Sequence, residues 1–174
     1  SAAVADAVMA SLAGTIALGQ TEACVAAMIR DKFSTLGADP EFAIVGAGDN
    51  GAMPHHEGGE RPIAAGDVIV IDIGARVDGM PSDITRSFVI GQPPADYLKI
   101  HALVDRAVQA AIAVARPGAR ACDVDAVARS VIAEAGYAEF FTHRTGHGLG
   151  LDLHEPPYIT SSSDLILCEG MVFS

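Results

Sequence analysis

The stretch over residues 66–90 constrains the fold most, because it predicts a β-hairpin. Two apolar runs rich in β-branched residues, 68–71 and 84–90, flank the dipeptide Asp78-Gly79. Asp-Gly is a strong signal for a two-residue hairpin turn, in which both central residues take a left-handed conformation. A hairpin of this kind belongs to an antiparallel sheet, so the chain is expected to contain one.

Two carboxylates, Asp72 and Asp83, interrupt the apolar runs of this hairpin. If the Asp-Gly dipeptide is the loop, Val77 pairs with Met80, and Asp72 lies opposite Thr85. Asp83 is two residues from Thr85, so it shares a face with Asp72 as a diagonal neighbour, about 7–8 Å away along the backbone. Two ionised carboxylates on one apolar face are costly to desolvate, and a cation between them removes that cost. In the alternative reading, one Asp faces solvent and the other caps a turn.

Composition narrows the class of protein. The 174 residues suit one domain with its own core. A net charge of −11 argues against nucleic-acid binding, which needs a basic surface, and is compatible with divalent cations. The three cysteines are odd in number and lack C-x-x-C spacing, so free thiols in a reducing cytoplasm are expected. No apolar run approaches the roughly 18 residues of a membrane span.

Apolar periodicity predicts four helices and several short strands. Helices are expected over residues 2–18, 21–36, 96–116 and 123–135, with Thr21 as an N-cap. Besides the hairpin, strands are expected at 42–45, 140–143, 149–153 and 171–174, with a tight turn at 146–148. A polar, glycine-rich loop is expected over residues 46–59, and an exposed apolar edge near residues 171–173 would invite pairing with another chain.

The chain also contains an internal repeat. A shift of 99 residues aligns Gly19 with Gly118, Gly37 with Gly136, and several apolar positions without a gap. Each half therefore predicts helix, glycine, helix, glycine, strand and loop. Such a duplication suggests two similar lobes about a pseudo-two-fold axis, with a cleft between them. The alternative is a chance similarity among alanine-rich helices.

The histidines are concentrated outside the helices. Only His101 falls within one, where we expect it at the surface; the others are His55, His56, His143, His147 and His154. His147 lies between two glycines, which allow the backbone to crowd closely around it. Together with Asp72 and Asp83, a histidine offers oxygen and nitrogen ligands of the kind that manganese, zinc, cobalt or iron accept. Two carboxylates can also bridge a metal pair about 3.5–4 Å apart, as in two-metal hydrolases.

Four motifs resemble the pita-bread metallopeptidases, within them the Xaa-Pro branch of prolidase and aminopeptidase P. These are DIG at residues 72–74, SDITR at 82–86, HRTGHGLGLDLHEPP at 143–157, and the histidine pair at 55–56. The resemblance covers nearly the whole chain. It implies an α+β pita-bread fold, with duplicated helix–helix–strand lobes around a curved antiparallel sheet.

The resemblance also implies a site and a substrate. The family uses two divalent metal ions, commonly manganese, held by two Asp, one His and two Glu, and by motif position Asp72, Asp83 and His147 are the first three. His154 would hydrogen-bond the scissile carbonyl or the oxyanion, His143 would line the pocket, and His55 would help hold the substrate. Proline-containing peptides would be the substrates, and a homodimer is expected for the full-length protein. Because an Xaa-Pro bond has no N–H, a pocket shaped for the proline ring must select it.

The chain departs from the family at its ends. In the family, the two Glu ligands follow the strand that residues 170–173 begin, and neither Glu155 nor Glu169 occupies their motif positions. We therefore expect residues 1–174 to be a piece of the catalytic domain without the N-terminal domain and the final strands, and with an incomplete metal site. Two alternatives to an Xaa-Pro peptidase stay open: a non-catalytic pita-bread binding module and a methionine aminopeptidase.

Overall fold

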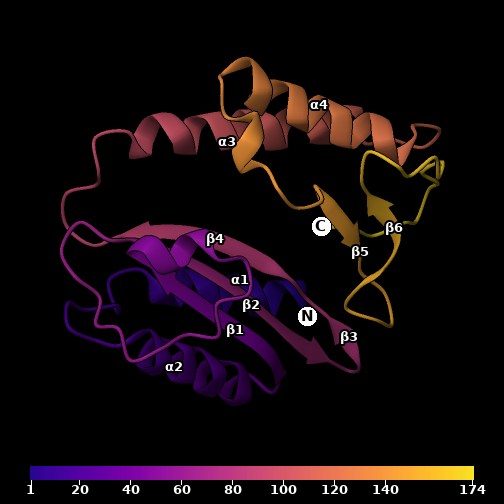
Figure 1. Ribbon diagram of the computed structural model, residues 1–174. Coiled ribbons are helices and arrows are strands. Elements are labelled where there is room, and N and C mark those ends of the chain that lie inside the picture. The colour runs from indigo at the N-terminus through magenta and orange to yellow at the C-terminus, as the bar shows by residue number, and fades with distance from the viewer. The chain divides into compact units, whose positions relative to one another are not determined.

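The computed structural model describes all 174 residues, which form two compact units, Ser1–Ala95 and Asp96–Ser174 (Figure 1). Unit 1 contains α1 (Ala2–Leu12), α2 (Glu22–Thr35), β1 (Asp39–Ala47), the 3-10 helix η1 (Gly48–Ala52), β2 (Val68–Val77), β3 (Met80–Pro81) and β4 (Ile84–Val89). Unit 2 contains α3 (Tyr97–Val114), α4 (Ala121–Glu134), the 3-10 helix η2 (Ala138–Phe140), β5 (Gly146–Gly148) and β6 (Glu155–Ile159). None of the helices combines the length and apolar character that a membrane crossing requires.

The sheet of unit 1 is antiparallel and is centred on β2, which pairs with β1 along one edge and with β3 and β4 along the other. Ile69, Ile71 and Ile73 alternate along β2 and are fully buried. They share one core with Leu12 of α1 and Phe33 of α2. Burying each such side chain contributes about 1.5–3 kcal/mol, so this apolar face holds the two helices against the sheet.

The hairpin forms with the predicted register. Asp78 and Gly79 both have positive φ, 51° and 80°, as a tight turn with left-handed central residues requires. Val77 pairs with Met80, and Asp72 lies opposite Thr85. Asp83 lies in the short gap between β3 and β4, two residues before Thr85.

Unit 2 is built from the antiparallel pair β5–β6 and two helices packed on each other (Figure 1). The apolar face of α3 is only partly buried. Leu103, Ala107 and Ala111 are buried, whereas Val104 and Val108 are about half exposed. His101 is exposed, as expected.

The internal repeat is a structural repeat. Helices α2 and α4 lie 99 positions apart at both ends, and the paired glycines all have positive φ. In unit 1 the Gly19 N–H donates to the Ile63 carbonyl at 2.9 Å, and in unit 2 the Gly118 N–H donates to the Leu167 carbonyl at 2.8 Å. In each unit, therefore, the glycine between the two helices is hydrogen-bonded to a later segment of the chain. The residue that accepts this bond, Ile63 or Leu167, is apolar and buried. This shared design excludes chance similarity among alanine-rich helices.

Helix boundaries differ from the prediction at the first helix. It ends at Leu12, not at residue 18, with Ala13 as its C-cap residue, because Gly14 takes a positive φ of 76°. The Thr15 hydroxyl and N–H both donate to the Leu12 carbonyl. Thr21 does cap α2, accepting from the Cys24 N–H at 3.1 Å.

Between residues 140 and 153, two predicted strands and one predicted turn are wrong. Residues 140–143 form no strand, because the Arg129 guanidinium donates to the carbonyls of Phe141 and His143 and so occupies groups that a ladder would use. Residues 146–148 form strand β5, not a tight turn. Residues 149–153 form no strand, and Leu151 is 78% exposed.

Residues 171–174 contribute an isolated bridge between Phe173 and Gly148 in place of the expected last strand. Val172 is 63% exposed, and Met171 is 37% exposed. Apolar side chains are therefore exposed here, although these residues form no strand edge. Their pairing with another chain stays a prediction.

Replacing Gly79 with Ala should destabilise the hairpin by about 1–2 kcal/mol, because a Cβ disfavours the left-handed conformation. Asp78→Asn is the matched control, since Asn tolerates positive φ and should leave the unfolding free energy nearly unchanged. Urea unfolding of the two variants measures both effects. Equal stability of Gly79→Ala and the parent protein would contradict the turn geometry.

Candidate active site

Asp72 and Asp83 are both half-buried on the hairpin of unit 1. The Oδ1 atom of Asp72 accepts a 2.7 Å hydrogen bond from the Thr85 hydroxyl opposite it. Ser82 is buried, and its hydroxyl and N–H both donate to the Ala75 carbonyl, at 3.0 and 2.9 Å. Through these hydrogen bonds, Ser82 connects the residues between β3 and β4 to β2. It thereby holds Asp83, the next residue, against the hairpin.

His147 lies on β5 in unit 2 and is 8% exposed. Its Nδ1 lies 3.1 Å from the Gly148 carbonyl oxygen, which can only accept, so Nδ1 carries the proton. When the ring is neutral, this arrangement leaves the lone pair on Nε2, the form in which histidine ligates metals. The ring of His154, which is exposed, lies 4.1 Å from the His147 ring between centroids.

The glycines around His147 are required by close backbone approach. A Cβ on Gly148 would collide with the backbone oxygens of Glu155 and Pro156, and a Cβ on Gly146 would collide with the Ser174 carbonyl. The crowding expected around His147 is therefore confirmed, although it arises within a strand pair and not within a turn. It leaves His147 as the one large side chain of β5.

A buried carboxylate, Asp125 of α4, holds the segment that leads into β5. It is fully buried and accepts hydrogen bonds from the Thr145 hydroxyl at 2.7 Å and from Arg129 Nε at 2.8 Å. Arg129 in turn donates to the carbonyls of Phe141 and His143. His143 itself is exposed, and its Nδ1 donates to the Arg144 carbonyl at 2.6 Å. The sequence analysis did not identify Asp125. The signal available in the sequence was a carboxylate four residues before an Arg, on the same face of the predicted helix.

A second buried carboxylate, Glu22, holds the loop that carries the histidine pair. Its side chain has no exposed surface and lies 2.6 Å from Nε2 of His56. Burial by itself raises the pKa of Glu22, but the hydrogen bonds it accepts, from the Ala47 N–H first, outweigh this effect and lower the pKa below its ordinary value. His55 is exposed. Glu22 lies in the first turn of the helix predicted over residues 21–36, and its burial was not predicted.

The predicted site residues thus divide between the units. Asp72, Asp83 and His55 belong to unit 1, and His143, His147 and His154 belong to unit 2. Neither unit by itself gathers three or more His, Cys, Asp or Glu side chains that could hold a metal ion. The donor set nevertheless fits a divalent metal, because two carboxylates and a neutral imidazole suit manganese, zinc, cobalt or iron.

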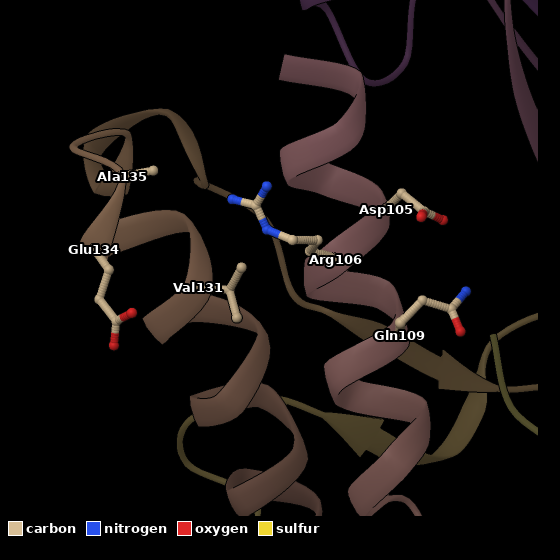
Figure 2. A pocket seen from close by; sticks show the side chains of 6 residues that line it. All are labelled: Asp105, Arg106, Gln109, Val131, Glu134 and Ala135. Atoms are coloured by element: carbon tan, nitrogen blue, oxygen red, sulfur yellow. The ribbon is translucent and has the colours of Figure 1, made fainter. Parts of the chain in front are cut away.

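An open depression between α3 and α4 is separate from all of these residues. Figure 2 shows Arg106 reaching from α3 toward α4 across it. Its lining residues are Asp105, Arg106, Gln109, Val131, Glu134 and Ala135. It contains none of the predicted site residues, so it does not define the candidate active site.

Comparisons with known proteins agree with this fold and these motifs. The sequence matches Metallopeptidase family M24 over residues 1–174. It is 48% identical over 158 residues to the probable dipeptidase PepE of Mycobacterium tuberculosis, covering 90% of this chain and 42% of that protein. It is 38% identical over 173 residues to the Xaa-Pro dipeptidase of Pyrococcus horikoshii, covering 98% and 49%. The crystal structure of dipeptidase PepE from Mycobacterium ulcerans matches with a TM-score of 0.96 and 44% identity, covering 98% of this chain and 47% of that one.

The chain therefore belongs to metallopeptidase family M24, and its fold is the α+β pita-bread fold. The resemblance seen in the sequence motifs is confirmed at the level of family and fold. The chain spans less than half the length of the curated relatives described above.

Replacing Gly148 with Ala should destabilise the β5–β6 pair by about 1–3 kcal/mol or more, because the added carbon meets backbone that cannot move aside. Gly150→Ala is the matched control: the three atoms nearest to its Cβ would belong to the carboxylate of Glu155, the end of a flexible side chain. Chemical unfolding should therefore show a larger loss for Gly148→Ala than for Gly150→Ala. The reverse order would contradict the packing around His147.

Replacing Glu22 with Gln should lower the unfolding free energy at pH 7 by about 2 kcal/mol or more, because buried donors lose their acceptor. The lowered pKa of Glu22 means that its stabilisation is present above the pKa of the unfolded chain, about 4.3. That stabilisation disappears as the pH falls through the lower folded-state pKa. The difference between parent and variant should therefore shrink below about pH 4, as measured by urea unfolding at several pH values. A difference independent of pH would contradict a lowered pKa.

Proposed function

We propose that the complete protein is a metal-dependent peptidase that hydrolyses Xaa-Pro peptide bonds. The observation that carries this proposal is the family match along the whole chain, together with two half-buried carboxylates on the hairpin whose register matches the prediction. The name of the Pyrococcus relative, Xaa-Pro dipeptidase, supports the substrate class. The chain accounts for only part of such a protein, so the activity is assigned to the complete protein.

Asp72, Asp83 and His147 are the proposed metal ligands, for two divalent ions. Manganese is the proposed metal, with zinc, cobalt and iron as alternatives. When bound, such ions supply Lewis-acid catalysis and an activated water. The two hairpin carboxylates would contribute negative charge, and the proton on His147 Nδ1 fits a ligand that binds through Nε2. The two Glu ligands of the family are assigned to no residue among these 174.

The remaining proposed roles belong to histidines that are exposed. His154 beside His147 would donate a hydrogen bond to the scissile carbonyl as it becomes an oxyanion. His143 would line the pocket, and its backbone is held by the Asp125–Arg129 pair. His55 would help hold the substrate. Because the Xaa-Pro nitrogen carries no hydrogen, selection would depend on the shape of the pocket around the proline ring.

We further propose that the protein acts as a cytoplasmic homodimer on proline-containing peptides and not on nucleic acid. Three cysteines without a disulfide fit a reducing compartment. The net charge of −11 argues against a nucleic-acid partner. The homodimer is carried over from the family resemblance alone.

In the complete protein loaded with manganese, Asp83→Ala should lower kcat/KM on an Xaa-Pro dipeptide by more than about 100-fold. Loss of a residue that only supports a ligand costs 10–100-fold, so loss of the ligand itself should exceed that range. Asp78→Asn, which removes a charge from the same hairpin at its turn, should retain activity. Metal content measured by mass spectrometry should fall in the Asp83 variant and not in the control.

The same assay decides among the alternatives. If the complete protein with manganese leaves Xaa-Pro dipeptides and longer Xaa-Pro peptides intact, the proposal is wrong. Release of N-terminal Met from test peptides would then indicate a methionine aminopeptidase. No cleavage of either substrate, with no bound metal, would indicate a non-catalytic binding module.

A further inference from the structure

The two adjacent histidines of the loop after β1 have different surroundings. His55 is exposed. The side chain of His56 is 17% exposed, and its Nε2 lies 2.6 Å from a carboxylate oxygen of Glu22, which has no exposed surface. Because an ionised carboxylate only accepts, Nε2 of His56 is the donor. The side chain of His56 is therefore bound to a buried partner, whereas the side chain of His55 faces solvent.

Glu22 also accepts hydrogen bonds from three other groups in the same segment. These are the Ala47 N–H at 2.8 Å, Nδ2 of Asn50 at 2.9 Å and the Gly59 N–H at 3.0 Å. Together with His56, these donors are distributed from Ala47, the last residue of β1, to Gly59 in the loop that follows. A single carboxylate at the start of α2 is thus the centre around which residues 47–59 are arranged.

Only a carboxylate can serve this arrangement. One oxygen faces the Ala47 N–H and Asn50, and the other faces His56 and the Gly59 N–H. An amide would replace one of these oxygens with a donor group, which would face the backbone N–H of Ala47 or of Gly59, and each of these can only donate. Because the site is buried, water cannot supply the missing acceptors.

The backbone of His56 is held as well. Its N–H donates to the Met53 carbonyl at 3.2 Å, which closes a turn around residues 54–55. With both the backbone and the side chain of His56 anchored, the preceding residue has little freedom to move. The position of His55 therefore depends on contacts that His55 does not itself make.

We propose that Glu22 and His56 are a positioning pair that holds residues 47–59 and thereby fixes His55, so that His55 alone of the two histidines meets the substrate. The substrate role of His55 rests on the proposed function. The anchoring of the segment does not, and the two are tested separately.

Hydrogen–deuterium exchange of the complete protein tests the anchoring without any activity. Glu22→Gln should raise exchange within residues 47–59 by about tenfold or more, since one tenfold step corresponds to the loss of a single hydrogen bond. Glu57→Gln, an exposed acid in the same segment, is the matched control and should change nothing. His56→Leu provides the same test if Glu22→Gln fails to fold. Unchanged exchange in a folded variant would overturn the proposal.

Kinetics on an Xaa-Pro dipeptide test the division of roles. His56→Gln keeps a donor for Glu22 and should retain KM and kcat within about threefold, whereas His56→Leu has no donor and should raise KM by roughly 10–100-fold through misplacement of His55. If His56 itself took part in proton transfer, both variants would lose kcat. Loss of kcat in His56→Gln would therefore overturn the assignment.

A double-mutant cycle completes the test. In a His55→Ala background, His56→Leu should add almost nothing to the loss in kcat/KM, because the residue that it positions is gone. Full additivity would overturn the proposal. If the parent protein cleaves no peptide, the proposed function is wrong, and the exchange experiment still decides whether Glu22 and His56 anchor the segment.

Discussion

The structure depends on two fully buried carboxylates, Glu22 and Asp125, each of which must be satisfied by hydrogen bonds inside the protein. Breaking one side of such an arrangement costs about 3–5 kcal/mol, because a buried charge is left uncompensated. Each carboxylate therefore dictates the path of the chain around it. Glu22 dictates the loop of the histidine pair, and Asp125 dictates the segment that leads into β5.

The duplicated scaffold does not supply these carboxylates at equivalent positions. With the shift of 99 residues, Glu22 corresponds to Ala121, and Asp125 corresponds to Ala26. The helices, their glycine ends and the returning segments are shared between the units, whereas the polar anchors are particular to each. The repeat thus provides a common frame, and each unit fixes its own histidine-bearing segment independently.

Sequence reasoning succeeded where structure is decided by neighbouring residues. The turn at Asp78-Gly79 sets the pairing of the whole hairpin, so counting outward from it placed Asp72 opposite Thr85, as the structure has it. It failed where a distant side chain competes with the backbone. Residues 140–143 have a strand-like composition, but the guanidinium of Arg129 binds the carbonyls of Phe141 and His143 and prevents a ladder there.

The sequence by itself determined the hairpin, the two equivalent helix pairs, and the motifs that mark family M24, because these are encoded by residues close together in the chain or at a constant spacing. Only the tertiary structure decided that Glu22 and Asp125 are buried and that His55 and His56 have different surroundings. The physical reason is distance along the chain. Glu22 accepts hydrogen bonds from groups 25 to 37 residues away, and no local pattern of polar residues predicts such partners.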